Sequence, residues 1–259
     1  MTSSPSPQDT PKDPSEDQHK NTEIMVMVPG HAVYMGRDAT QARLSEHWKG
    51  TFPGYQDNDE AELYWEHIRT GVLTTARSKK IDGLPRESLL IFSGGETRTA
   101  AGPYAEAQSY WFLAHQHNWF GQIQMEKFAT TEEFARDSFE NLLFSIHRFK
   151  QVTRRLPTQV IVCGFSFKHE RYEFHWKTIM QHLQHSGVQL HDLKADFFYI
   201  DVNDPPPYLL QGPGGSLSGE TETLSLFRAD PLAQNPPLLT KEEERDRTHR
   251  HHPYPVSRK

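Results

Sequence analysis

The apolar residues of this chain fall into short, nearly continuous runs that alternate with segments in which apolar positions recur every three or four residues. The runs are typical of strands buried on both faces, and the periodic segments are typical of amphipathic helices. The expected strands cover 24–28, 88–92, 122–127, 158–163 and 195–202, and the expected helices cover 61–77, 104–116, 130–151 and 167–185. Because parallel strands need crossover connections, this order predicts an α/β domain whose mainly parallel sheet carries helices on both faces.

The two ends of the chain do not follow this pattern. Residues 1–22 are rich in Pro, Ser, Asp and Lys, so we expect a disordered tail that is neither a signal peptide nor a transit peptide. Residues 23–210 are expected to form the α/β domain. Residues 211–259 begin with a Gly-rich connector and are expected to be a largely irregular tail, with a short helix over 220–227 that folds back on apolar anchors as the alternative.

Composition narrows the classes of protein to consider. The mean hydropathy of -0.74 is low for a compact domain, and the two tails account for it. A net charge of -6 gives no basic field for phosphate backbones, so nucleic-acid binding is not expected. No run approaches the roughly 18 apolar residues that cross a bilayer. We therefore expect a cytosolic protein without a membrane partner, with entry into the nucleus left open, and we expect the single cysteine, Cys163, to be a small buried hydrophobe.

The strand expected at 88–92 breaks at Ser93-Gly94-Gly95, just before a helix. In parallel sheets ligands bind beyond the carboxyl ends of the strands, and the exposed N–H groups of such a turn can receive an anion. A tight turn that needs positive φ is the structural alternative. Glu106, in the first turn of the next helix, either caps that helix or faces the cleft as a catalytic base.

A second polar cluster lies early in the helix expected at 130–151. Helical spacing places Asp137, Glu140 and Asn141 on one face, with Ser138 beside them. One interpretation is a polar helix surface. The other is a hydrogen-bonded ligand site in which Asp137 acts as a base, because buried amides and carboxylates need partners.

A third cluster follows the strand expected at 158–163. Lys168 and Arg171 lie near a helix start, where cations gain nothing from the helix dipole, so an anionic ligand or the acidic clusters would account for them. A solvated basic turn is the alternative. Ser166 also belongs to this predicted ligand-binding set, but Phe167 and Lys168 follow it, so the segment is not a Gly-x-Ser-x-Gly elbow and a serine hydrolase is not expected.

The first strand ends at Gly30 and His31, where an imidazole can touch a ligand or exchange a proton near neutral pH. Gly30 and Gly36 do not make the three-glycine dinucleotide fingerprint. The other histidines lack carboxylate companions at ligand spacing, so no metal site is predicted.

Taken together, these segments resemble the domain-of-unknown-function 218 family, the SanA-like and YdcF-like proteins, over about residues 24 to 200. The residues that carry the likeness are Pro29-Gly30-His31, Ser93-Gly94-Gly95, Glu106-Ala107, Ala135-Arg136-Asp137-Ser138-Phe139-Glu140-Asn141 and Ser166-Phe167-Lys168-His169-Glu170-Arg171. The resemblance implies a Rossmann-like three-layer sandwich, and S-adenosylmethionine as a cofactor, since some bacterial relatives are linked with it. The family pattern usually has a histidine where this chain has Lys168, and this chain looks like a soluble, fungal-type branch.

Three functional hypotheses follow from these clusters, and the sequence leaves open whether the protein is an enzyme. The first is a protein that binds a small anionic or nucleotide-like molecule, such as S-adenosylmethionine or a phosphorylated metabolite. The second is a non-catalytic interaction module that recruits a protein through the C-terminal tail or through the aromatic-rich loop expected at 47–57. The third is a metal-dependent phosphoester or nucleotidyl-transfer enzyme, which needs a divalent ion on Asp137, Glu140 or Glu106.

Overall fold

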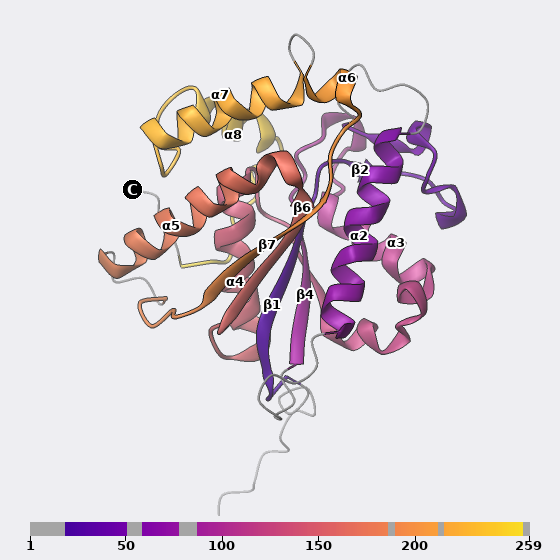
Figure 1. Cartoon of the computed structure of the whole chain (residues 1–259), viewed down its shortest axis with the longest axis horizontal. Coiled ribbons are helices and arrows are strands. Elements are labelled where there is room, and N and C mark those ends of the chain that lie inside the picture. The colour runs from indigo at the N-terminus through magenta and orange to yellow at the C-terminus, as the bar shows by residue number, and fades with distance from the viewer. Residues whose placement is uncertain (1–18, 51–58, 78–86, 186–189, 212–214, 256–259) are drawn as a thin grey trace, which may run out of the picture.

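A single five-stranded parallel sheet organises the molecule, with strand order β5-β4-β1-β6-β7 (Figure 1). The computed structural model describes residues 19–50, 59–77, 87–185, 190–211 and 215–255. The strands are β1 (Thr22–Pro29), β4 (Glu87–Ser93), β5 (Ala129–Glu132), β6 (Gln159–Phe165) and β7 (Asp196–Asn203). The predicted Rossmann-like α/β sandwich is therefore confirmed.

Helices cover both faces of the sheet. The helices are α2 (Asp59–Arg77), α3 (Glu106–Gln116), α4 (Ser138–Thr153), α5 (His169–His185), α6 (Pro207–Leu210), α7 (Ser216–Ala229) and α8 (Leu238–Arg245). In the central strand β1, Val26 and Val28 pack with α2 and α3, whereas Met25 and Met27 pack with α4 and α5. This alternation follows from the two-residue period of a strand, and it explains why β1 is apolar without interruption.

The edge strand β5 is the element whose position differs most from the prediction. Residues Ile123–Phe128 form 3-10 turns rather than the expected strand, and the strand follows at Ala129–Glu132. Its threonines pair in parallel with β4, Thr130 opposite Ile91. Helix α4 then begins only at Ser138, because the chain needs residues 129–132 to complete the sheet. The helix therefore begins eight residues later than the sequence predicts, at Ser138 instead of at residue 130.

The aromatic-rich segment expected to be a loop at 47–57 is structured where it is described. Trp48 and Lys49 form β3, which pairs in antiparallel fashion with β2 (Val33–Tyr34). The indole of Trp48 is buried and its Nε1–H donates to the carbonyl of Ala42 at 2.8 Å. Residues 51–58 lie outside the described residues. Trp48 is thus part of the core and is not an exposed anchor for a partner.

The C-terminal segment is not the largely irregular tail expected for residues 211–259. It contains α7 and α8, and its apolar side chains join the core formed by α4 and α5. Leu224 and Phe227 are buried because they lie three residues apart on one face of α7. The alternative of a helix that folds back is confirmed, over a longer range than 220–227. At the other end, β1 already begins at buried Thr22, and residues 1–18 lie outside the described residues.

Two further expectations concern composition. Among the described residues, no helix is long and apolar enough to cross a membrane. Cys163 is fully buried in β6, and burial raises the pKa of its thiol to about 12. This confirms the prediction that Cys163 packs as a small hydrophobe.

Candidate functional site

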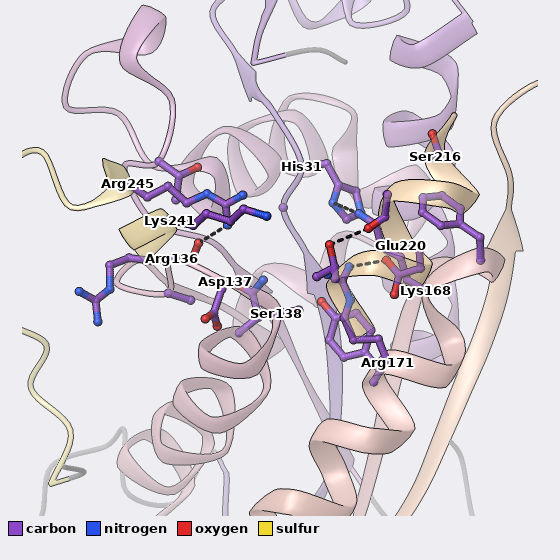
Figure 2. Close-up of a pocket in the computed structure, with 18 of the residues that line it drawn as sticks. His31, Arg136, Asp137, Ser138, Lys168, Arg171, Ser216, Glu220, Lys241 and Arg245 are labelled. Atoms are coloured by element: carbon purple, nitrogen blue, oxygen red, sulfur yellow. Dashed lines mark hydrogen bonds and ion pairs between the residues drawn. The ribbon is translucent and has the colours of Figure 1, made fainter. Parts of the chain in front are cut away.

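A cavity of about 580 Å³ lies beyond the carboxyl ends of the strands. Its lining includes Gly30 after β1, Arg98 after β4, Asp137 after β5 and Lys168 after β6, and α7 and α8 add the opposite wall. Figure 2 shows the charged side chains of this lining in two groups that face each other across the cavity. The position is the one that parallel sheets generally provide for ligands.

Lys168 and His31 meet at one side of this cavity. The Lys168 Nζ lies 3.3 Å from His31 Nδ1, and it sits over the rings of Phe165 and Phe167 at 5.0 and 5.4 Å. Burial, with Arg171 nearby, lowers the pKa of Lys168 to about 7. Burial, with Lys168 nearby, holds the pKa of His31 well below its usual value. Near neutral pH the His31 imidazole is therefore neutral, and its Nδ1 is placed to accept a hydrogen bond from the Lys168 amine.

Arg171 finds its partner in the C-terminal segment. Its Nη2 lies 2.9 Å from Oε2 of Glu220 on α7, and both side chains are mostly buried. Burial raises the pKa of the Glu220 carboxyl, and Arg171 opposes that shift. Within the described chain, Nε of Arg171 and Oε1 of Glu220 have no hydrogen-bond partner. Both atoms are buried, so what the structure shows is an ion pair that joins α5 to α7 beside the cavity.

Glu106, a predicted base, lies at the start of α3 and lines the cavity. Its Oε1 accepts hydrogen bonds from Thr97 Oγ1 at 2.6 Å and from Arg98 Nε at 2.9 Å. Arg98 also donates to the carbonyl of His31. A Cβ at Gly30 would lie 2.5 Å from the Cβ of Glu106, so glycine is required for α3 to approach β1 this closely. Glu106 and Arg98 together hold the loop that carries His31.

The Ser93-Gly94-Gly95 loop does not receive an anion in the way the sequence suggested. The N–H of Gly94 donates to the carbonyl of Glu132 at 3.0 Å, and the N–H of Gly95 donates to that of Ala135 at 2.8 Å. The Ser93 hydroxyl donates to Glu132 Oε2 at 2.7 Å. The chain uses these groups itself, so the loop supports β5, and none of the three residues lines the cavity.

Asp137 is the N-cap of α4 and does not lie on the helical face predicted for it. Its Oδ1 accepts the N–H of Glu140 at 2.8 Å, while Glu140 itself holds Arg136 at 2.6 Å. Arg136 also reaches Glu242 and Asp246 at 3.3 and 3.2 Å. Among the described residues, no group of three His, Cys, Asp or Glu side chains is arranged to hold a metal ion. The carboxylates considered for a divalent ion serve here as a cap and as ion-pair partners.

Of the three serine and asparagine residues predicted to bind a ligand in these clusters, Ser138 and Asn141 line the cavity, whereas Ser166 does not. The Ser138 hydroxyl lies 2.8 Å from Nε2 of His175, a buried residue on α5 that the sequence did not single out. The Asn141 amide accepts from Ser93 at 2.9 Å. Ser166 donates instead to a backbone carbonyl of β7 at 3.3 Å. The first two residues are thus available to a ligand, and Ser166 joins two strands.

Several charged groups of the site were missed in the sequence because they lie on α7, on α8 or in the loop before α3. Lys241 and Arg245 are four residues apart, so they share a face of α8, but their spacing has meaning only once that segment is known to be helical. The cationic lining residues are Arg98, Arg136, Lys168, Arg171, Lys241 and Arg245, and the acidic ones are Glu106, Asp137, Glu220 and Glu242. A protein of net charge -6 therefore carries a cavity with more cations than anions.

Comparison with known proteins shows similarity to a yeast protein that is described as uncharacterized, YOR238W of Saccharomyces cerevisiae. The two are 26% identical over 274 residues, which cover 89% of this chain and 86% of the relative. No protein-family model and no solved structure matches the chain. The resemblance to the domain-of-unknown-function 218 family stays a prediction. The support for the candidate site is therefore its geometry alone.

Proposed function

We propose that this protein binds a small anionic molecule in the cavity at the carboxyl edge of its sheet. The observation that carries the proposal is the excess of cationic over acidic side chains in the lining, six against four. Charges in a cleft with low-dielectric walls act more strongly than the same charges in water. The cavity volume of about 580 Å³ is also in the range typical of small-molecule sites.

The charge of the lining favours a phosphorylated or carboxylated metabolite over S-adenosylmethionine. That cofactor carries a sulfonium and an ammonium cation for one carboxylate, and a cationic lining repels the first two. An anion, in contrast, can accept from the guanidinium of Arg171 and gain from Lys168 and Arg98. A reducing compartment such as the cytosol or nucleus suits a chain with a single, buried cysteine and forms part of the same proposal.

The interaction-module hypothesis has less support from the structure. Among the described residues of the two segments proposed to recruit a partner, the aromatic side chains of Trp48 and Phe227 lie in the core, only 3% and 1% exposed. An adaptor surface generally presents its aromatic anchors to solvent. We therefore propose that the C-terminal segment forms part of the cavity wall. The third hypothesis, metal-dependent phosphoester chemistry, is tested by measuring turnover of a phosphoester with added divalent ions.

Calorimetric titration with inorganic phosphate, sugar phosphates, nucleoside monophosphates and S-adenosylmethionine tests the proposal. A double variant, Lys241→Ser with Arg245→Ser, removes two solvent-exposed cations of the lining. We expect it to weaken binding of the phosphorylated ligands about twofold to thirtyfold, since each of the two exposed charges contributes about 0.2–1 kcal/mol.

Lys177→Ser with Arg69→Ser is the matched control for the net charge, because both cations lie on the surface, with 70% and 47% of their side chains exposed. Neither residue lines the cavity, so this double variant is expected to leave the affinity unchanged. The proposal is wrong if no member of the panel binds, or if the double variant binds as tightly as the control.

A further inference from the structure

The amine of Lys168 is held in surroundings unlike those of an ordinary surface lysine. It is 9% exposed, it lies over two phenylalanine rings, and it still borders the cavity. Desolvation and a neighbouring cation, here Arg171, are the two conditions that keep a lysine amine neutral and therefore nucleophilic. A lysine whose only task was to attract anions would be better left solvated and charged.

His31 is fixed in the position of a proton acceptor for this amine. Its Nδ1 lies 3.3 Å from Lys168 Nζ. Its backbone is held at both polar groups, since its N–H donates to the hydroxyl of Tyr110 at 3.2 Å and its carbonyl accepts from Arg98. Figure 2 shows the His31 ring and the Lys168 amine joined on the same side of the cavity.

The residue one helical turn further supplies an anchor for an anionic group. Arg171 follows Lys168 by three residues and, as described above, keeps Nε without an acceptor in the described chain. Arg171 contacts Glu220 through Nη2 and lines the cavity with 12% of its side chain exposed, so a carboxylate or phosphate can approach its guanidinium from the cavity. A ligand whose anionic group meets Arg171 therefore brings its neighbouring atoms toward Lys168.

We propose that Lys168 forms an imine with a small carbonyl compound that carries an anionic group, such as a 2-oxo acid. This inference rests on the proposed function and names the class of ligand for the same cavity. The Lys168 Nζ attacks the carbonyl carbon, and the π electron pair of the C=O bond moves to oxygen. A proton passes from Nζ to His31 Nδ1 and on to that oxygen. The resulting neutral carbinolamine loses one water, formed from its hydroxyl and the remaining N–H proton, and leaves a neutral imine that takes up one proton from solvent. The step therefore needs neither an oxidant nor a reductant.

Reductive trapping of the wild-type protein tests the proposal without a variant. The full chain is incubated with glyoxylate and cyanoborohydride at pH 7, and peptide mass spectrometry locates the reduced adduct. We expect Lys168 to be labelled at least about tenfold faster than exposed Lys177, because a much larger fraction of its amine is neutral. Malonate, a dianion without a reactive carbonyl, is expected to protect Lys168, and acetaldehyde, which has no anionic group, is expected to label it slowly.

A variant separates a role of His31 in the reaction from a role in the fold. His31→Gln should slow the labelling of Lys168 severalfold and leave that of Lys177 unchanged, with circular dichroism confirming that the variant is folded. If malonate binds by calorimetry but Lys168 is labelled no faster than Lys177, the imine is wrong and the anion site stands. If malonate does not bind and Lys168 is labelled no faster than Lys177, both the anion site and the imine are wrong. Equal labelling by acetaldehyde and glyoxylate would overturn the class of ligand.

Discussion

Replacement of Phe227 by alanine is expected to lower the free energy of unfolding by about 3–5 kcal/mol, the typical cost of emptying a buried phenylalanine site. The side chain is 1% exposed, and its ring meets the imidazole of His175 at 4.4 Å in an edge-to-face arrangement. Urea denaturation followed by tryptophan fluorescence measures the change. A loss of this size is a large fraction of the 5–15 kcal/mol that stabilises a typical domain.

Leu217 provides the matched control on the same helix. Its side chain is 44% exposed, so Leu217→Ala is expected to change the free energy of unfolding by less than about 0.5 kcal/mol. Equal effects of the two substitutions would show that α7 does not pack on the core. A chain that ends at Gln211 loses Phe227 together with Leu238 and Tyr254, which are also buried, and should not unfold cooperatively at all.

This packing makes the cavity depend on the C-terminal segment. Phe227 and Glu220 lie seven residues apart, two turns of the same helix, and both line the cavity. Loss of Phe227 therefore loosens the element that holds Arg171 through Glu220. We expect Phe227→Ala to weaken anion binding as well as stability, whereas an exposed tail would affect neither.

The buried strands of the sheet were predictable because each of them appears in the sequence as a continuous run of apolar residues. The apolar run at 24–28 lies within β1, and the run at 158–163 overlaps β6. The edge strand β5 has no such run. It is short and contains Thr130 and Thr131, which are half-buried, so its hydrophobicity does not distinguish it from a loop.

The candidate site was predictable only where the order of the strands alone determines it. Gly30, His31, Lys168 and Arg171 follow β1 and β6, which are neighbours in the sheet, so their common edge follows from the parallel arrangement. The ion pair between Arg171 and Glu220 could not be predicted in this way, because Glu220 lies beyond a Gly-rich connector and the pairing is a tertiary contact.

The Ser93-Gly94-Gly95 loop is a case in which the local sequence predicts the backbone conformation but not its hydrogen-bond partners. Its glycines are required by the fold, since Gly94 has φ of +155° and a Cβ at Gly95 would lie 2.8 Å from the carbonyl oxygen of Ala135. The pattern indicated a turn with N–H groups at a strand end, which is what the structure contains. It could not indicate that β5 and the segment after it supply the carbonyls those groups bind, at Glu132 and Ala135.

Replacement of Glu132 by glutamine is expected to stabilise the protein by about 3 kcal/mol at pH 8 and by clearly less at pH 5. Burial raises the pKa of this carboxyl from 4.5 to about 7, despite hydrogen bonds from Ser93 and from the N–H of Phe134. A group with a raised folded-state pKa contributes its full stability below the unfolded value, and that stability is lost as the pH rises through the folded value. The wild-type protein therefore loses stability between pH 4.5 and about 7, and the variant does not.

Glutamine can keep the hydrogen bonds of the protonated carboxyl, which makes the comparison one of charge alone. Its amide NH₂ can donate to Ser93 Oγ, which then donates to Asn141 Oδ1 at 2.9 Å, and its oxygen still accepts from Phe134. Urea denaturation at intervals between pH 5 and 8 gives the slope for each protein. Glu126→Gln, at a side chain that is 54% exposed, is the control and should run parallel to the wild type. Parallel curves for Glu132→Gln and the wild type would mean that Glu132 is ionised throughout, and that the Ser93 loop and the Tyr254 hydroxyl at 3.3 Å stabilise a buried carboxylate instead of a neutral acid.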